Sequence, residues 1–267
     1  MKNFVFFVIA SMAILCSCQQ NCGKTESVEP VGVSDNLLNA TLWMQHSAEY
    51  RACCLQTYRF AKTALAENLR TKSTDKPAAV VLDIDETVLD NTYYEAYLAA
   101  NNTTFCDSTW ALWSLKADAT EVPGAKDFLE YAVSLGVEVI FVSNRYPTEL
   151  ETTIAKMQKL GFPEIPDKNF YLKEKGASSC KKERRDIVSQ TYEIIMLVGD
   201  NMGDFTEEFD GSKSDGDMIA ETDSLADVFG QKYIVLPNPT YGTWEKPILA
   251  DTSKTSRQNR IDALKTF

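Results

Sequence analysis

Histidine is almost absent from this sequence, and its cysteines have no recurring spacing. His46 is the only histidine among 267 residues, which excludes catalysis by a histidine nucleophile and zinc sites rich in histidine. It lies in a helical pattern, so we expect it to be a packing residue. The seven cysteines contain no CxxC pair, and the five that follow Cys18 are odd in number. They predict neither a zinc site nor a disulfide framework, although one pair could form in an oxidising compartment.

Basic residues are also in deficit. Lysine and arginine total 27 against 38 aspartates and glutamates, which gives a net charge of −11. A general nucleic-acid binder needs clustered lysine and arginine for phosphate contacts, so no nucleic-acid polymer is expected as a partner. A small anionic substrate remains compatible with this charge if a metal ion or a local cationic group reverses the field at its site.

No apolar stretch is long enough to span a bilayer. Residues 4–15 are apolar and follow Lys2, but a spanning helix needs about 20 such residues. A leucine three positions before Cys18 and a serine directly before it resemble a bacterial lipoprotein signal, which implies that residues 1–17 are removed and that Cys18 carries the lipid. Cys16 fits less well, because a bulky leucine would precede the cut, and an ordinary secretory peptide is the alternative. We therefore expect a lipid-anchored protein of the cell envelope.

The rest of the chain divides by its hydrophobic pattern. Residues 18–33 lack periodicity and are expected to be a flexible tether, whereas 34–74 carry an apolar stripe typical of helices. Short apolar runs separated by helical stretches follow, and such runs are typical of strands covered on both faces of a parallel α/β sheet. We predict one domain over 34–250, an insertion at 90–120 and a C-terminal tail at 251–267. The predicted strands are 78–84, 137–142, 169–172, 194–198 and 233–236, and the predicted helices between them are 125–135, 148–160 and 181–190.

Polar side chains follow four successive predicted strands. Asp83 and Asp85 come directly after the first, in the segment VLDIDET, and Ser143-Asn144-Arg145 follow the second. A lysine cluster near Lys181 follows the third, and GDNMGD (199–204) follows the fourth. Ligands bind beyond the carboxyl ends of the strands in such sheets, so these residues are expected to meet at one site. Crowded carboxylates repel one another and resist desolvation, so a cation is expected among them.

These segments resemble a known family. VLDIDETVLDN (81–91), IMLVGDNMGDF (195–205), PNPTYGTWE (237–245) and LWMQHSAEY (42–50) are similar to the class C acid phosphatases, bacterial outer-membrane lipoproteins of the haloacid dehalogenase superfamily. The resemblance runs over about residues 35–247. It implies a three-layer, Rossmann-like α/β core with a parallel sheet and a small helical cap, formed by the N-terminal helices and the 90–120 insertion.

The resemblance also implies a mechanism and a cofactor. Asp83 would attack phosphorus to form an aspartyl-phosphate, and Asp85 would protonate the leaving oxygen and later activate water. Mg²⁺ would be held by the Asp83 carboxylate, the Asp85 backbone carbonyl and Asp200, with Asp204 in or just outside the coordination shell.

Further residues are assigned to the phosphoryl group by the same resemblance. Ser143 and Asn144 would hold its oxygens, and a lysine would offset its charge. The register of the KKERRDIV segment favours Lys181, with Lys182 as the alternative and Lys173 as a weaker one.

Aromatic residues suggest the substrate class. Trp113 and Tyr241 lie on segments expected to rim the site, where they could stack on a nucleotide base, whereas Trp110 is expected to belong to the core. The resemblance implies the same preference, for nucleoside monophosphates and aromatic phosphomonoesters. Two alternatives stay open: a surface binding lipoprotein with a vestigial site, and a phosphotransferase that passes the aspartyl-phosphate to another alcohol. The chain could also form a homo-oligomer.

Overall fold

Five short strands form a central sheet in the computed structural model, which describes residues 35–209 and 213–267. All neighbouring pairs run parallel, with β1 in the middle, where every one of its five residues is buried. Burial on both faces explains why the strands appear in the sequence as continuous apolar runs. The predicted parallel α/β fold is confirmed. In spatial order the strands are β5 (Phe170–Leu172), β4 (Glu138–Ser143), β1 (Ala78–Leu82), β6 (Glu193–Gly199) and β7 (Tyr233–Val235).

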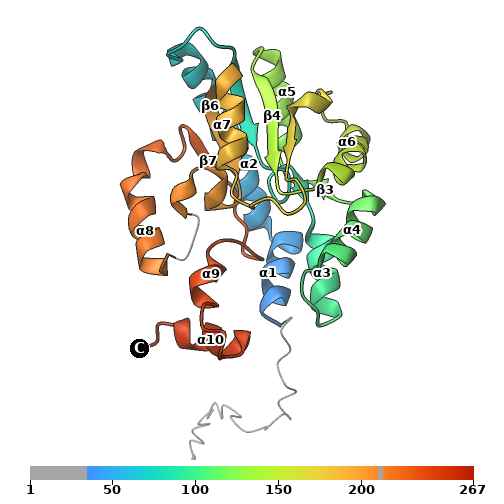
Figure 1. The fold of residues 1–267 in the computed structure, drawn as a ribbon, viewed down its shortest axis with the longest axis vertical. Coiled ribbons are helices and arrows are strands. Elements are labelled where there is room, and N and C mark those ends of the chain that lie inside the picture. The colour runs from blue at the N-terminus through green and yellow to red at the C-terminus, as the bar shows by residue number, and fades with distance from the viewer. Residues whose placement is uncertain (1–34, 210–212) are drawn as a thin grey trace, which may run out of the picture. The chain divides into compact units, whose positions relative to one another are not determined.

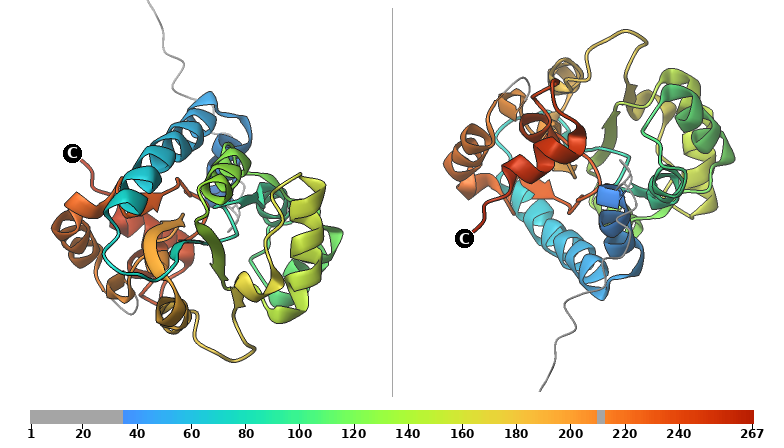
Figure 2. Two further views of the ribbon diagram at one scale, coloured as in Figure 1. Left: turned by 90° about the horizontal axis from the view of Figure 1, so that it is seen from above. Right: turned by 90° about the horizontal axis from the view of Figure 1, so that it is seen from below.

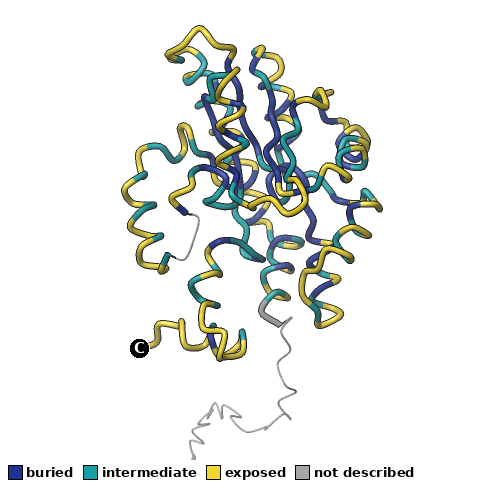
Figure 3. The backbone as a smooth tube through the Cα atoms, viewed as in Figure 1, coloured by how far each residue is buried: buried dark blue, intermediate teal, exposed yellow. Residues whose placement is uncertain are grey.

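Helices cover both faces of this sheet (Figures 1 and 2). Alternate residues of β1 belong to two separate hydrophobic clusters, because successive side chains of a strand point to opposite faces. Ala78, Val80 and Leu82 pack in the larger cluster with α2 (Ala48–Thr71) and α5 (Ala125–Ser134). The smaller cluster contains Ala79, Val81 and Val188, the last from α7 (Lys182–Thr191). Buried backbone therefore concentrates along the sheet (Figure 3).

Several helices lie beyond the end of the sheet at which the strand arrows point (Figure 1). α1 (Asp35–His46) packs against α3 (Thr92–Ala100), which is followed by α4 (Asp107–Lys116). The short strands β2 (Leu89–Asp90) and β3 (Thr120–Glu121) pair antiparallel at the base of the α3–α4 segment. The helices α1, α3 and α4 therefore stand next to the carboxyl ends of the strands, where ligands of such sheets bind.

The C-terminal region returns to the same end of the molecule. Residues 251–267, which we expected to be a tail, contain α10 (Ser256–Ala263), whose first turn is capped by the Thr255 hydroxyl accepting from the Gln258 amide. Asn259 also donates to the Asp251 carbonyl, 2.9 Å away, so local hydrogen bonds define this segment. The other helices are α6 (Leu150–Lys159), α8 (Asp215–Ser224) and α9 (Glu245–Ile248), with 3₁₀ turns at Pro147–Glu149, Asp167–Asn169, Met202–Asp204, Glu207–Phe209 and Ala226–Val228.

Two expectations about the N-terminal half need comment. His46, expected to be a packing residue of a helix, is instead the exposed last residue of α1. The predicted signal peptide, the lipidated Cys18 and the tether lie outside the described residues. Among the helices of the described part, none is long and apolar enough to cross a membrane.

Candidate active site

The loop that follows β1 directs two aspartates toward one cavity. The Asp83 amide donates to the Val198 carbonyl of β6, and the amides of Val88 and Leu89 both donate to the Ile84 carbonyl, closing a tight turn. Ile84 is fully buried, so the side chains on either side of it, Asp83 and Asp85, point away from the core. These backbone hydrogen bonds define the conformation of the loop, and the loop conformation in turn fixes the positions of both carboxylates.

The support for this loop comes from a distant helix. Tyr58 of α2 is buried, and its hydroxyl donates to the Thr87 carbonyl at 2.6 Å. Thr87 in turn donates through its hydroxyl to Asp200, which follows β6, and Asn238 donates to the second oxygen of Asp200 at 2.8 Å. Asp200 is thereby held beside the loop by two neutral donors.

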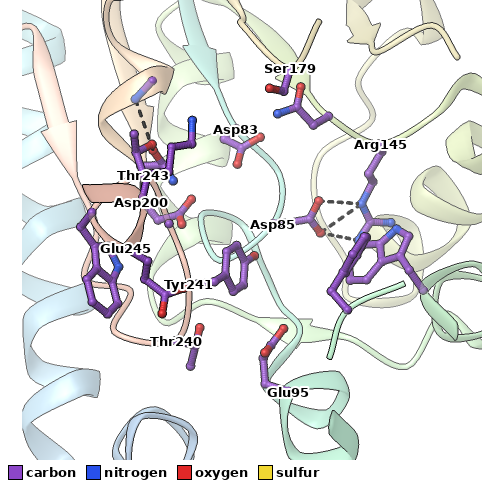
Figure 4. A pocket seen from close by; sticks show the side chains of 18 of the residues that line it. Asp83, Asp85, Glu95, Arg145, Ser179, Asp200, Thr240, Tyr241, Thr243 and Glu245 are labelled. Carbon is purple, nitrogen blue, oxygen red and sulfur yellow. Dashed lines mark hydrogen bonds and ion pairs between the residues drawn. The ribbon is translucent and has the colours of Figure 1, made fainter. Parts of the chain in front are cut away.

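Three carboxylates and one lysine meet in the wall of the cavity, in which Figure 4 labels Asp83 and Asp200. Oxygens of Asp83, Asp200 and Asp204 all lie within 4.8 Å of one another. The Lys181 ammonium lies 2.5 Å from Asp83 Oδ1 and 2.6 Å from Asp204 Oδ1, and all three side chains are largely buried. Lys182, the alternative lysine, is exposed on α7 and pairs with Asp186. The structure therefore brings Lys181, and not Lys182, to the acids.

The position of Asp204 depends on a glycine and a backbone amide. The Asn201 amide donates to Asp204 Oδ2 at 2.9 Å, which closes a capping box at the turn after β6. A Cβ added to Gly199 would lie 2.5 Å from the Asp204 Cβ, so only glycine leaves room for this side chain. The GDNMGD segment thus positions Asp204 through its own backbone.

Burial makes this cluster electrostatically unfavourable without a further cation. It raises the pKa of Asp83 to about 7, although Lys181 opposes the shift, and the charges of Asp204 and Asp85 add to it. The pKa of Asp200 is raised well above its usual value by burial and by the charges of Asp204 and Asp83. One lysine does not balance three clustered acids, and closely spaced carboxylate oxygens are the ligands that hard divalent cations take. The residues therefore fit a divalent metal ion.

Asp85 points toward a different partner. Arg145 Nη2 lies 2.7 Å from Asp85 Oδ1, and the arginine is itself fixed by Thr153 and by the ring of Trp110, 5.5 Å from the guanidinium carbon. Asn91 donates a further hydrogen bond to the same carboxylate. The Asp85 side chain is therefore held by Arg145 (Figure 4) and is not part of the cluster of Asp83, Asp200 and Asp204.

The acids occupy one end of a cavity of about 820 Å³. Of the residues proposed from the sequence, Asp83, Asp85, Asn144, Lys173, Lys181, Asp200, Asp204 and Tyr241 line it. Ser143 does not: it is fully buried, and its hydroxyl accepts from the Arg145 amide. The Lys173 ammonium lies 5.1 Å from the centre of the Tyr146 ring. The lysine that contacts the acids is Lys181.

The two tryptophans of α4 exchange their expected roles. Trp110, expected in the core, lines the cavity and donates its indole N–H to Glu149. Trp113, expected at the rim, is absent from the cavity wall; its indole donates to the Asn91 side chain and its ring stacks on Tyr93. The reason is the direction of α4, which sequence alone does not define.

Sequence reasoning missed the partners of the site residues. Tyr241 was expected to stack on a substrate, but its hydroxyl also donates to the buried Glu86. Asn144 accepts from Arg184 Nη2 at 2.8 Å. Arg145 appeared only as the third residue of a strand-end triplet. For Asn144 and Arg145 the local signal was their position directly after a predicted strand.

A doubly covered parallel sheet with buried acids and a lysine beyond its strand ends is the arrangement of an α/β ligand-binding site, and its acids could hold a metal ion. The model of the haloacid dehalogenase (HAD) superfamily, subfamily IIIB (acid phosphatase), matches residues 10–244, and the chain belongs to this family. The predicted family, and with it the class of acid phosphatase enzymes, is confirmed.

Solved structures agree. The class C acid phosphatase of Bacillus anthracis has a TM-score of 0.80 and 36% sequence identity, over 88% of this chain and 98% of that one. A second structure of the Bacillus anthracis enzyme, with tungstate bound, gives the same score and identity over 99% of its chain.

More distant relatives come from plants. The stem 31 kDa glycoprotein of Glycine max is 29% identical over 49% of this chain, and vegetative storage protein 2 of Arabidopsis thaliana is 24% identical over 62%. The matched regions span only 53% and 62% of those two proteins.

Proposed function

We propose that this protein is a Mg²⁺-dependent phosphomonoesterase that works through an aspartyl-phosphate on Asp83. The observation that carries the proposal is the contact of the Asp83 carboxylate with the buried Lys181 ammonium at the floor of a large cavity, beside two further acids. A carboxylate held there can meet a phosphoryl group while the ammonium offsets the group's charge.

The steps use two aspartates in turn. An Asp83 oxygen bonds to phosphorus as the bond from phosphorus to the leaving oxygen breaks, and Asp85 gives that oxygen a proton. A water molecule then attacks phosphorus and gives its proton to Asp85, which frees Asp83 and releases inorganic phosphate. Arg145 orients the Asp85 carboxylate through both of its oxygens, the role that a positioned acid–base group requires.

Asp83, Asp200 and the Asp85 carbonyl would hold Mg²⁺, with Asp204 in or next to the coordination shell. When bound, the ion would neutralise charge on the transferring phosphoryl group. Lys181 bridges Asp83 and Asp204 through its ammonium, and Asn238 and Thr87 orient Asp200. Asn144 lines the cavity and would hold a phosphoryl oxygen, and the tungstate in the related structure, itself a tetrahedral oxyanion, supports such a site.

Nucleoside monophosphates and aromatic phosphate esters are the proposed substrates. Tyr241, Trp110 and Trp244 line the cavity, so an aromatic leaving group would find ring faces, each able to add about 1–3 kcal/mol. Such stacking does not read base edges, so several bases should be accepted.

Phosphate release from a panel of monophosphates, measured with Mg²⁺ and with a chelator, tests the function. We expect release that falls by about a hundredfold or more on chelation, since the metal carries charge at the reacting group. Nucleotides and aryl phosphates should exceed glycerol phosphate in kcat/KM. Equal rates of phosphate release with Mg²⁺ and with chelator would contradict the proposed dependence on a metal ion. A preference for glycerol phosphate would contradict the proposed substrate class.

Two alternatives have their own outcomes in this panel. The relatives named as storage proteins support a non-enzymatic role, and the absence of phosphate release from every ester would favour a binding protein. A phosphotransferase would instead make a new ester when an alcohol is added in excess. The presence of Asp83, Asp85, Asp200 and Asp204 together with Lys181 favours an enzyme over a binding protein, and the yield of the new ester decides between hydrolase and phosphotransferase.

Anchoring through Cys18 is proposed from the sequence. A single acyl chain holds a protein only weakly, whereas several chains hold it firmly. We expect Cys18→Ala to leave the precursor uncut or to release the protein into the soluble fraction of the envelope. Membrane fractionation with a Cys22→Ala control measures this. A Cys18→Ala variant that is still processed and needs detergent for extraction would move the lipid to Cys16 or rule it out.

A further inference from the structure

Glu95 is a buried acid in the wall of the same cavity. It lies on α3, in the segment after the first strand, and is only 6% exposed. Within residues 35–209 and 213–267 its carboxylate forms neither a hydrogen bond nor an ion pair, yet it lines the cavity. A buried carboxylate without a partner is costly, and in proteins such groups are normally satisfied by another protein group, by ordered water or by a ligand.

The charges near Glu95 leave it without compensation. The neighbouring Glu245, at the start of α9, is paired with Arg260 at 2.5 Å, so that guanidinium is already engaged. Burial, followed by the like charge of Glu245, raises the pKa of Glu95 to about 7. The Arg260 guanidinium pairs with Glu245 and not with Glu95, so the Glu95 carboxylate favours hydrogen-bond donors and cations over anions.

The location of Glu95 separates it from the reacting atoms. In the view of Figure 4, Tyr241 lies between Asp83 and Glu95. The cavity of about 820 Å³ is within the range that holds a whole small-molecule ligand, so a phosphoryl group at Asp83 would fill only one end of it. The alcohol part of a substrate would extend past Tyr241 toward Glu95.

We propose that Glu95 is a specificity-determining residue that accepts a hydrogen bond from a hydroxyl or ammonium group at the remote end of the substrate's alcohol. The inference rests on the proposed phosphomonoesterase function and adds a substrate feature to it: the preferred esters carry a donor at their far end. This contact is separate from base stacking, because Glu95 provides a hydrogen-bond acceptor, whereas stacking needs an aromatic ring.

The experiment compares straight-chain alkyl phosphates of increasing length that end in methyl, hydroxyl or ammonium. The kcat/KM ratio of each donor-bearing ester to its methyl-ended partner is measured for the wild type, Glu95→Gln and Glu151→Gln. Glu151, on α6, is exposed and outside the cavity, so its variant controls for the loss of one negative charge.

We expect the wild type to prefer a donor-bearing ester at one chain length by about ten- to a hundredfold, as for a hydrogen bond to a buried charged group. Glu95→Gln should abolish the preference for ammonium and keep part of that for hydroxyl, because the amide retains an acceptor oxygen but no charge. Glu151→Gln should preserve both ratios. If only the ammonium preference exists, the natural donor is a cation; if only the hydroxyl preference exists, it is a neutral polyol.

The outcomes separate this inference from the proposed function. If no ester releases phosphate, the proposed function fails. If all esters are hydrolysed and the ratios are near one, or do not change in Glu95→Gln, the role of Glu95 is wrong. Inhibition of the wild type by amino alcohols against plain alcohols of equal length gives the same comparison should Glu95→Gln not fold, and equal inhibition would overturn the inference.

Discussion

Replacing Asp83 with asparagine is expected to reduce kcat by at least about a thousandfold, because an amide cannot attack phosphorus as a carboxylate does. The fold should persist, since Lys181 keeps its contact with Asp204 and the Asp83 backbone keeps its bond to Val198. Phosphate release under saturating nucleotide, with thermal melting in parallel, measures both effects. The matched control is Asp186→Asn, which removes an exposed carboxylate one turn into α7.

The same variant also separates nucleophilic from electrostatic roles for Asp83. Beryllium fluoride imitates a phosphoryl group on a carboxylate, so it should inhibit the wild type and bind at Asp83, while Asp83→Asn should not retain it. Substantial turnover by purified Asp83→Asn would disprove the aspartyl-phosphate. A loss of turnover equal to that of Asp186→Asn would do the same.

The sheet could be predicted from the sequence because burial on both faces leaves a local trace. Each residue of β1 is buried, so the strand had to be apolar throughout, and the same holds for the last five residues of β6. Acids directly after such strands are visible in the sequence, and the parallel arrangement brings their ends together. Asp83, Asp200 and Asp204 therefore meet where the pattern predicted.

The partners of these acids could not be predicted, because they depend on distances between segments far apart in the chain. Arg145 reaches Asp85 across 60 positions of sequence, and Tyr241 reaches Glu86 across 155. Trp110 and Trp113 are three residues apart, on nearly the same face of one helix, and only the tilt of α4 decides which one meets the cavity. The surroundings of Glu95 could not be predicted for the same reason, because its sequence neighbours give no sign that Glu245 of α9 will lie near it.

Replacing Lys181 with methionine is expected to cost roughly 3–5 kcal/mol of folding free energy in the absence of a divalent metal ion, because it leaves buried carboxylates without their cation. Lys181 is 5% exposed and lies within hydrogen-bonding distance of both Asp83 and Asp204. Urea unfolding in chelator at pH 8 measures the loss. Lys182→Met is the control: its ammonium is half exposed and pairs at the surface, so its removal should change stability by less than about 0.5 kcal/mol.

The stability lost in Lys181→Met should depend on pH and on the metal ion. The folded-state pKa of Asp83 is raised above its unfolded value, so the folded protein binds the proton more tightly and stability falls as pH rises from about 4 toward 7. Lys181 opposes that shift, and without it the fall should be steeper, so the cost of Lys181→Met should be smaller at pH 5 than at pH 8. Mg²⁺ should restore more stability to Lys181→Met than to the wild type, because it supplies the missing positive charge. Equal stabilities of Lys181→Met and Lys182→Met in chelator at pH 8 would mean that Lys181 does not neutralise this cluster.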